Sequence, residues 1–318
     1  MRFVTLRNGG RPSPGVIVGS EVLDLAACGE IVPAARLVPP SVRGILEAGD
    51  AGLDLVRRVV DLVGGGKVDR ERLRQAGALR AREQAILEAP IPNPGLLLSC
   101  GMNYHEHLRE MRTPVPEKPT AFTKNLASIV GSGAPIVLPA AHPNMVDWEG
   151  EFSAVVGRTC HNVRVSEALD YVAGYTLIND VSARDWVPEV FAATGLMGPI
   201  LAWERNLLGK QFPTFCPMGP VFVTRDELPD PNDVRLTTTL NGEVMQAAHT
   251  SDLVFDVAHL VAYYSQFYRL RPGDVITTGS PAGVGYGRTP KLFMKPGDII
   301  EVHAEKIGTL SNPVVAAG

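Results

Sequence analysis

The 318-residue sequence has few cysteines, no long apolar run and no excess of basic residues. Its four cysteines are widely spaced and form no CxxC pair, so buried free thiols in a reducing cytoplasm are expected. No apolar stretch reaches the length of a membrane span, and Met1–Thr5 leads into a strand pattern rather than a signal peptide. The net charge of −4 provides no basic surface for nucleic acid. These absences predict a cytoplasmic protein that binds neither membrane nor nucleic acid.

Glycine and proline, in contrast, are abundant, with 32 and 26 residues. Such turn-rich chains are more often β-rich than helical bundles. Hydrophobic and charged contents of 45% and 20% are ordinary for a globular enzyme, and the length favours two domains. The proline-rich segment 89–95 cannot hold a helix and is the best linker candidate. The sequence therefore predicts an α+β protein, with a small N-terminal α+β domain over residues 1–92 and a mostly β catalytic domain over residues 93–318.

Local patterns divide the N-terminal part into strands followed by helices. The first 25 residues predict short strands over Arg2–Leu6, Gly15–Val18 and Glu21–Leu25, with a turn at residues 8–10. Apolar residues then recur at helical spacing over Ser41–Val63 and Asp69–Glu88.

Two patterns beyond the linker are equally specific. The pair Asn241-Gly242 between two strand-like runs predicts a type I′ hairpin. Further on, Ser251 or Asp252 is placed to cap a helix over about residues 254–270.

Two glutamates one residue apart carry the clearest chemical signal. In an extended strand Glu149 and Glu151 point to the same face, and the apolar residues that alternate after them pack behind. Asp180 ends an apolar run and could complete a cluster of three carboxylates, which cannot share a dry pocket without a cation. All-oxygen ligands favour Mg²⁺, with Mn²⁺ or Ca²⁺ as alternatives. A solvated strand face is the other interpretation of the same spacing.

The glycine-rich segment 277–287 invites a phosphate-loop interpretation. It lacks the GK[ST] ending of a P-loop, and Pro290 interrupts any helix that would follow. Its backbone amides could still form an anion site, for which a carboxylate is a better guest than a nucleotide.

Six ordered blocks over about residues 98–303 together resemble the fumarylacetoacetate hydrolase family. They begin with Cys100–Met111, which contains G-x-N-Y-x-x-H-x-x-E, and continue with the E-x-E pair and Asn179–Asp185. The remaining blocks are Gly209–Pro220, Leu240–Gln246 and Thr278–Gly285. Residues 1–90 look like the accessory domain of bacterial members.

The resemblance implies a catalytic domain built as a mixed β-sheet roll, usually in a homodimer. It implies that Glu149, Glu151 and Asp180 bind the divalent metal. A His–Glu pair on a mobile lid, which maps to His107 and Glu110, would activate water. A lysine that polarises the substrate oxygen maps to Lys210.

The T-G-[ST]-P loop, here Thr278, Gly279 and Ser280, would bind the carboxylate of the substrate. Arg184 belongs to the third-ligand block and is expected near the substrate, either orienting ligands with Asp185 or in an ordinary ion pair.

Spacing alone leaves the roles of the histidines open. His107 and Glu110 would share one helical face, as a general base and its orienting carboxylate require. An exposed ion pair has the same spacing. His105 and His107 could also bind a soft metal, although the three carboxylates argue against it and favour His105 as a lid residue.

The sequence departs from the family after Asp185. Trp186 and Val187 stand where many members carry a glutamine that contacts substrate, and residues 188–208 are longer and more apolar than expected. We expect these changes to alter the pocket or its dimer-facing wall, and to favour a bulky or apolar substrate tail over a second carboxylate.

The leading functional hypothesis is metal-dependent hydrolysis of a carbon–carbon bond in a β-diketo acid such as an acylpyruvate. The alternatives are a lyase or isomerase on related 2-oxo or 2-hydroxydienoic acids: an oxaloacetate decarboxylase, a hydratase, or a tautomerase of aromatic catabolism. From other classes, a structural Ca²⁺-binding module and a nucleotide-binding protein are the alternatives. The retained His107, Glu110 and Lys210 argue against the first, and the incomplete phosphate loop argues against the second.

Overall fold

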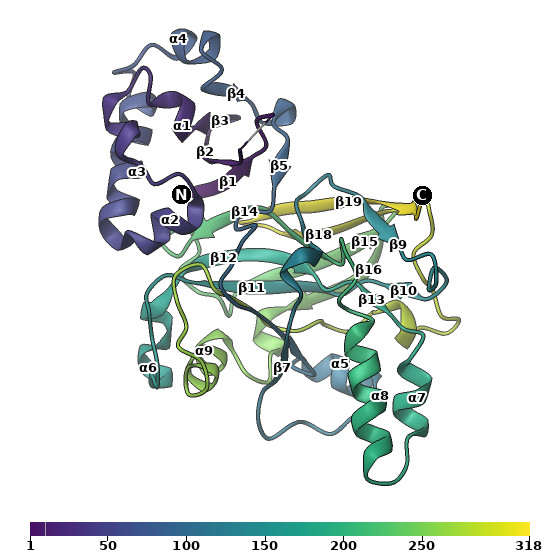
Figure 1. Ribbon diagram of the computed structural model, residues 1–318. Helices are drawn as coiled ribbons and strands as arrows, with labels where there is room; N and C mark the ends of the chain where they lie inside the picture. Colours follow the sequence, from purple (N-terminus) through teal and green to yellow (C-terminus); the bar gives the residue numbers. More distant parts are fainter. Residues whose placement is uncertain (10) are drawn as a thin grey trace.

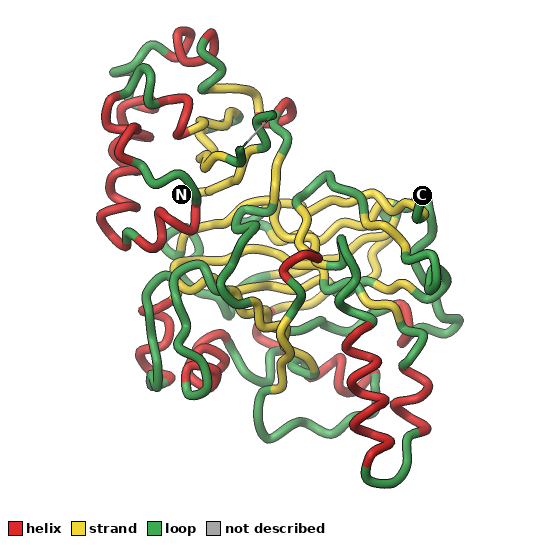
Figure 2. Tube along the Cα trace, in the orientation of Figure 1, coloured by secondary structure: helices red, strands yellow, loops and turns green. Residues whose placement is uncertain are grey.

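The computed structural model describes residues 1–9 and 11–318 and has a mixed α/β architecture. Strands occupy its centre and helices its periphery (Figure 2). The N-terminal strands form an antiparallel meander close to the predicted bounds: β1 (Arg2–Leu6), β2 (Ser13–Val18) and β3 (Glu21–Asp24). The turn predicted at residues 8–10 includes Gly10, which lies outside the described residues.

Helices follow this meander, and their apolar sides share a core with it. They are α1 (Leu25–Cys28), η1 (Pro33–Leu37), α2 (Val42–Glu47), α3 (Gly49–Gly64) and α4 (Arg70–Gln75). The helix predicted over Ser41–Val63 is present but divided, because Gly49 takes a φ of +62° where α3 begins.

The helix predicted over Asp69–Glu88 is wrong beyond Gln75. Gly77 has a φ of +70°, and the chain then turns back to the sheet. The remaining segment forms β4 (Leu79–Ala81), η2 (Arg82–Gln84) and β5 (Leu87–Glu88). Strand β4 pairs with β3 and β5 pairs with β1, so backbone pairing and tertiary packing override a helical apolar pattern.

The largest sheet crosses the predicted domain boundary. Its order is β4-β3-β2-β1-β14-β12-β11-β17-β6-β7. Beyond the meander its strands are β6 (Leu97–Gly101), β7 (Thr120–Thr123), β11 (Gly150–Val156), β12 (Val172–Asn179), β14 (Cys216–Thr224) and β17 (Val275–Thr277). Strand β1 pairs antiparallel with β14, where Phe3 stacks on Phe222 with ring centroids 5.8 Å apart. The N-terminal part forms a separate lobe in Figure 1 yet shares one sheet with the rest, and the 1–92/93–318 division stays a prediction.

A second sheet, in the order β16-β15-β18-β19-β9, lies beside the first. Its strands are β9 (Ile136–Leu138), β15 (Arg235–Leu240), β16 (Glu243–His249), β18 (Ile299–Ala304) and β19 (Gly308–Ala316). The hairpin between β15 and β16 has positive φ at both Asn241 (53°) and Gly242 (83°), which confirms the type I′ prediction. Two short ladders complete the strands: β10 (Val146–Asp147) pairs with β13 (Ser182–Ala183), and β8 (Ile129–Val130) pairs with β14.

The remaining helices lie at the edge of the strands. They are α5 (His105–Glu110), η3 (Leu126–Ser128), α6 (Val165–Ala168), η4 (Leu169–Tyr171), α7 (Val187–Ala192), α8 (Met197–Leu208), η5 (Thr250–Asp252), α9 (Val257–Ser265) and η6 (Gly285–Gly287). Helix α9 is shorter than predicted and is capped by Asp256, whose side chain accepts from the N–H of His259. The predicted caps, Ser251 and Asp252, lie in η5 instead.

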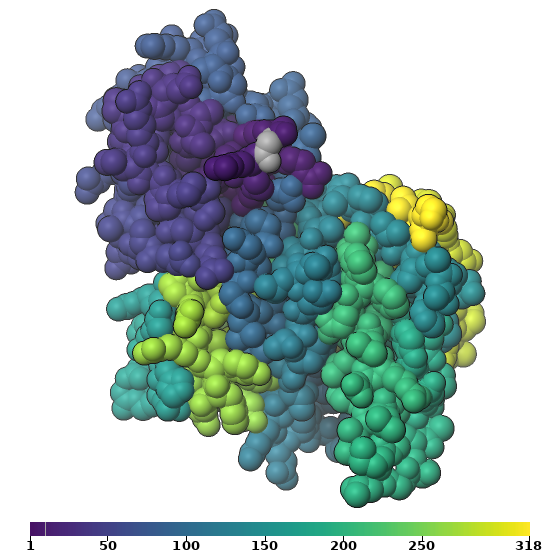
Figure 3. Space-filling view, in the orientation of Figure 1, coloured from purple at the N-terminus to yellow at the C-terminus, as the bar shows by residue number. Residues whose placement is uncertain are grey.

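Helices α7 and α8 form a hairpin that projects from the body (Figures 1 and 3). Along the described chain, no helix combines the length and apolar character that crossing a membrane requires. The prediction of buried free thiols is confirmed for all the cysteines, Cys28, Cys100, Cys160 and Cys216.

Candidate active site

Two adjacent strands bring three carboxylates together. Strands β11 and β12 pair antiparallel with Gly150 opposite Asn179, so Glu149 and Asp180 meet at one end of the ladder. One carboxylate oxygen from each of Glu149, Glu151 and Asp180 lies within 4.8 Å of the others. All three residues are buried, so they do not form a solvated strand face.

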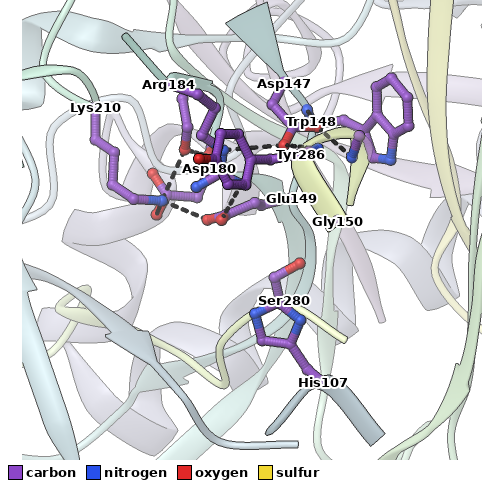
Figure 4. Close-up of polar contacts among 12 residues, drawn as sticks. His107, Asp147, Trp148, Glu149, Gly150, Asp180, Arg184, Lys210, Ser280 and Tyr286 are labelled. Carbon is purple, nitrogen blue, oxygen red and sulfur yellow. Dashed lines mark hydrogen bonds and ion pairs between the residues drawn. The ribbon is translucent and has the colours of Figure 1, made fainter. Parts of the chain in front are cut away.

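Two buried lysines neutralise part of this negative charge. Lys210 Nζ donates to Asp180 Oδ2 at 2.9 Å and to Ser182 Oγ at 2.7 Å, and also forms an ion pair with Glu149 (Figure 4). Lys124 pairs with the other oxygen of Asp180. Burial alone raises the pKa of Asp180, but the two lysines outweigh it and hold that pKa below its usual range.

Arg184 joins the cluster to the loop after β17. Its Nη2 donates to Glu149 Oε1 at 2.6 Å and its Nε donates to Asp147 Oδ2 at 2.9 Å. Asp147 in turn accepts from the N–H groups of Gly285 and Tyr286, at 2.7 and 3.0 Å. Asp185, expected beside Arg184, lies instead 3.3 Å from His142 Nδ1.

Glu151 is left without a partner. Both of its carboxylate oxygens are buried and accept no hydrogen bond from the described residues. Burial, together with the charges of Asp180 and Glu149, raises the pKa of Glu151 well above its usual range. The cations that bind Glu149 lower its pKa despite its burial, so the two glutamates differ although they are two residues apart.

This donor set fits a divalent cation. A buried carboxylate that accepts no hydrogen bond and forms no ion pair of its own is costly, and a cation placed among the three carboxylates would offset this cost. The ligand atoms are all oxygens, which suit Mg²⁺, Mn²⁺ or Ca²⁺ better than a thiophilic metal. Glu149, Glu151 and Asp180 are therefore the residues that could hold a metal.

His107 and Glu110 interact across one turn of α5. His107 Nδ1 lies 2.9 Å from Glu110 Oε2, and Glu110 Oε1 accepts from the N–H of Gly283 at 3.0 Å. An ionised Glu110 accepts from Nδ1–H, which leaves Nε2 as the free basic nitrogen. His105, two residues earlier on the helix, projects from a different face, which argues against a metal pair with His107.

Glu149, from the carboxylate cluster, and His107 border the same cavity of about 490 Å³. Its polar lining includes His107, Glu149, Arg184, Lys210 and Ser280, drawn in Figure 4, where the imidazole points toward the side of Ser280 and Glu149. The rest of the lining is mostly apolar and comes largely from β7, α7 and α8.

The predicted carboxylate-binding loop divides into structural and accessible residues. Thr278 is fully buried, and both its N–H and its hydroxyl donate to the carbonyl of Phe152. Gly279 adopts a φ of +86°, which turns the chain so that Ser280 reaches the cavity. Gln246 holds Ser280 Oγ at 2.9 Å and also accepts from the N–H of Gly150 at 3.0 Å, so it links this loop to β11.

The sequence did not mark several residues that contact the cluster or the residues around it. These are Ser99, whose hydroxyl donates to Asp180 at 2.8 Å, and Lys124, Asp147 and Gln246. Asp147 continues the alternation of Glu149 and Glu151 and could have been found from that spacing. The others are distant in sequence from their partners, and no local pattern marks them.

Comparisons with known proteins agree with this geometry. Residues 97–315 match the model of the fumarylacetoacetate (FAA) hydrolase C-terminal family. The chain is 36% identical to "Oxaloacetate tautomerase fahd2, mitochondrial" of Xenopus laevis, over 99% of this chain and 90% of that protein. It is 38% identical to the human "Oxaloacetate tautomerase FAHD2A, mitochondrial", over 87% and 81%. The chain therefore belongs to the fumarylacetoacetate hydrolase family, as the sequence blocks indicated.

Solved structures show the same fold over the full length. Fumarylacetoacetate hydrolase from Exiguobacterium antarcticum superimposes with a TM-score of 0.76 at 32% identity, and each chain is covered completely. Maleylpyruvate hydrolase from Sphingobium sp. SYK-6, solved with manganese(II) and pyruvate, gives a TM-score of 0.70 at 26% identity with the same coverage. The relatives are enzymes, and they include both hydrolases and tautomerases.

Proposed function

We propose that this protein is a divalent-metal-dependent enzyme acting on an enolisable 2-oxo acid, and that its reaction is hydrolysis of a carbon–carbon bond in a β-diketo acid of the acylpyruvate type. The observation that carries the proposal is one cavity bordered by His107, which Glu110 orients, by Lys210 and by Glu149 of the carboxylate cluster. That arrangement supplies a base and a substrate-binding cation site together.

Glu149, Glu151 and Asp180 would hold the cation, which when bound would supply Lewis-acid polarisation of the oxygens of a 2-oxo acid. The structure of a relative bound to manganese(II) and pyruvate supports this assignment. Mg²⁺ is the first choice for this chain, with Mn²⁺ or Ca²⁺ as alternatives.

His107 is the proposed general base. Its Nε2 takes a proton from water as the oxygen attacks the distal carbonyl, and Glu110 stabilises the imidazolium that results. The carbon–carbon bond then breaks, its electron pair passes to the departing 2-oxo fragment, and the imidazolium returns the proton to that fragment. The products are a carboxylic acid and a 2-oxo acid, so the sum of the steps is the addition of one water.

The other residues of the cavity position and stabilise the substrate. Lys210 offsets negative charge as it develops on the fragment that leaves, because its ammonium is buried beside the cluster. Arg184 holds Glu149 in place and borders the cavity, and Ser280 is available to the substrate carboxylate. Gly279 contributes backbone to that carboxylate site, whereas Thr278 acts by fixing the loop.

A second candidate is tautomerisation, which the names of the relatives from Xenopus laevis and human favour. In this reaction a proton moves between a carbon and the adjacent oxygen, with no water consumed and no carbon–carbon bond broken. The same His107 could carry that proton. The cytoplasmic location and the homodimer stay predictions, and the mitochondrial names of the relatives describe those proteins only.

The test compares His107→Ala with His105→Ala, a matched substitution on the same helix. With Mg²⁺ and an acylpyruvate, loss of the enol absorbance and formation of the 2-oxo acid product are followed together. His107→Ala should lose hydrolysis by at least about two orders of magnitude, the usual contribution of a general base, and His105→Ala should not.

Oxaloacetate decides between the candidates. If the wild type converts only the enol of oxaloacetate to its keto form and releases no product from any acylpyruvate, tautomerisation replaces hydrolysis. If decarboxylation occurs, it should survive in His107→Ala, because it needs chelation and charge stabilisation but no activated water. Unchanged hydrolysis in His107→Ala would contradict the role of this histidine.

A further inference from the structure

The cavity is lined by two chemically different groups of side chains. Glu149, Lys210 and Arg184 form the charged group. The side chains from the α7–α8 hairpin that border the cavity are almost entirely apolar: Val187, Val190, Phe191, Trp203 and Leu207. Met111, just after α5, adds to this apolar group. We call these six residues the apolar wall.

The cationic residues of the cavity lining are already paired. Arg184 binds Asp147 and Glu149, and Lys210 binds Glu149 and Asp180. Among the described residues that border the cavity, these two are the only lysine or arginine side chains. A substrate carboxylate placed against the apolar wall would therefore lose its hydration without gaining a counter-charge, which is unfavourable.

Two large side chains of the apolar wall are exposed in the structure. Phe191 and Trp203 have 66% and 50% of their surface accessible although both border the cavity. An apolar group bound in the cavity against them would cover part of this surface. Of the two residues predicted to alter the pocket or its dimer-facing wall, Val187 borders the cavity and Trp186 does not. Trp186 packs on His142, with ring centroids 4.4 Å apart, and the tryptophan at the cavity is Trp203.

We infer that the substrate is a 2-oxo acid with a single carboxylate and an apolar tail, an alkyl chain or an aromatic ring, and that Phe191 and Trp203 determine this specificity. The inference rests on the proposed function, because the 2-oxo acid group must bind beside the carboxylate cluster. It also departs from the relatives, whose names give oxaloacetate, a dicarboxylic acid, as the compound on which they act.

The inference can be tested by measuring the binding of compounds that the enzyme does not convert, so that the result does not depend on catalysis. Calorimetry in Mg²⁺ would compare pyruvate with straight-chain 2-oxo monoacids of increasing length, and each monoacid with the dicarboxylic acid of matching length. Affinity should rise by about fourfold for each added methylene until the cavity is filled. The dicarboxylic acids should bind more weakly than their monoacid partners.

Substitutions test whether Phe191 and Trp203 cause the dependence of affinity on tail length. Trp203→Ala and Phe191→Ala should flatten the dependence on tail length while the affinity for pyruvate stays the same. Leu196→Ala and Ile200→Ala are the matched controls, because these side chains are also exposed apolar groups of the hairpin, 85% and 56% accessible, but do not border the cavity. Trp203→Lys should raise the affinity for the dicarboxylic acids, since it supplies the missing counter-charge.

The outcomes separate this inference from the proposed function. If pyruvate and the short monoacids bind but the tail adds nothing, or the dicarboxylic acids bind more tightly, the apolar-tail inference is wrong and the proposed function stands. If no 2-oxo acid binds in Mg²⁺ at all, the proposed function is wrong as well. A tail dependence that the control variants abolish equally would overturn the assignment to Phe191 and Trp203.

Discussion

Replacing Glu151 with glutamine should have opposite effects in the absence and in the presence of a divalent cation. The Glu151 carboxylate is fully buried, and none of the described residues donates a hydrogen bond to it. Without a cation, folding of the wild type must either bury the charge of Glu151 or take up a proton, and Glu151→Gln avoids both costs while keeping nearly the same shape, so the variant should be more stable than the wild type at neutral pH. The variant lacks one of the cation's ligands, so addition of a divalent cation should raise its stability less than that of the wild type.

Without a cation, the difference in stability between Glu151→Gln and the wild type should depend on pH in a defined direction. Burial and the nearby carboxylates raise the pKa of Glu151 in the folded protein well above its usual range. Between the unfolded and folded pKa values the folded wild type therefore holds a proton that the unfolded chain has lost, and its stability falls as the pH rises. The advantage of Glu151→Gln should then be small at about pH 4 and grow above it.

The size of the cation effect follows from mass action. At a free cation concentration 100 times its dissociation constant, binding stabilises the folded wild type by about 2.7 kcal/mol. An unfolding entropy of about 2.1 cal/mol/K per residue, applied to 318 residues, makes this a rise of about 4 °C in Tm. Thermal unfolding by circular dichroism, in EDTA and in a series of Mg²⁺ and Mn²⁺ concentrations, measures both effects.

Glu243→Gln is the matched control, because Glu243 is exposed on β16, away from the cluster. It should leave the response to the cation unchanged. Equal cation-induced rises in Tm for Glu151→Gln and the wild type would refute the assignment of Glu151 as a ligand. A metal-free Glu151→Gln protein less stable than the wild type would refute the argument from the unpartnered charge.

Three further substitutions test the contacts around the cluster. Gln246→Leu leaves the buried N–H of Gly150 without an acceptor and should lower the free energy of unfolding by about 1–3 kcal/mol, measured in urea; an unchanged value would mean that water replaces the side chain. Lys124→Met removes one partner of a buried ion pair with Asp180. Because Asp180 keeps Lys210, metal-free unfolding should show a loss below the roughly 3–5 kcal/mol of a fully uncompensated buried charge; a gain in stability would show that the pair is dispensable. Gly283→Ala should lower Tm, because a Cβ at this position, with φ +100°, would lie 2.1 Å from a carbonyl oxygen of β16; a Tm equal to that of the wild type would mean that the loop shifts without cost.

Local patterns were sufficient for those features that depend on neighbouring residues. The alternation of side chains along an extended strand placed Glu149 and Glu151 on one side, with Phe152 in the core behind them. The spacing of His107 and Glu110 gave their contact across one helical turn. Both relations follow from backbone geometry over four residues or fewer, which the sequence determines by itself.

The N-terminal helices show where local patterns fail. Residues 76–88 have apolar positions at helical spacing, yet they form strands, because the exposed edges of β1 and β3 offer backbone partners that a local pattern does not contain. Asp252 likewise had the chemistry of a helix cap, but the chain continues past it to Asp256 before α9 begins.

The sequence by itself determined the identity and local spacing of the chemical groups, the family and the type of fold. Only the tertiary structure decided which distant groups meet: Lys124 reaches Asp180 across 56 residues, and Trp203, rather than Trp186, borders the cavity. Pairing within the fold then separated two neighbouring glutamates, since Glu149 is paired with cations and Glu151 is not. The reason is physical: the pairing and hydration of a charge depend on atoms brought together by the folded chain, which local sequence does not specify.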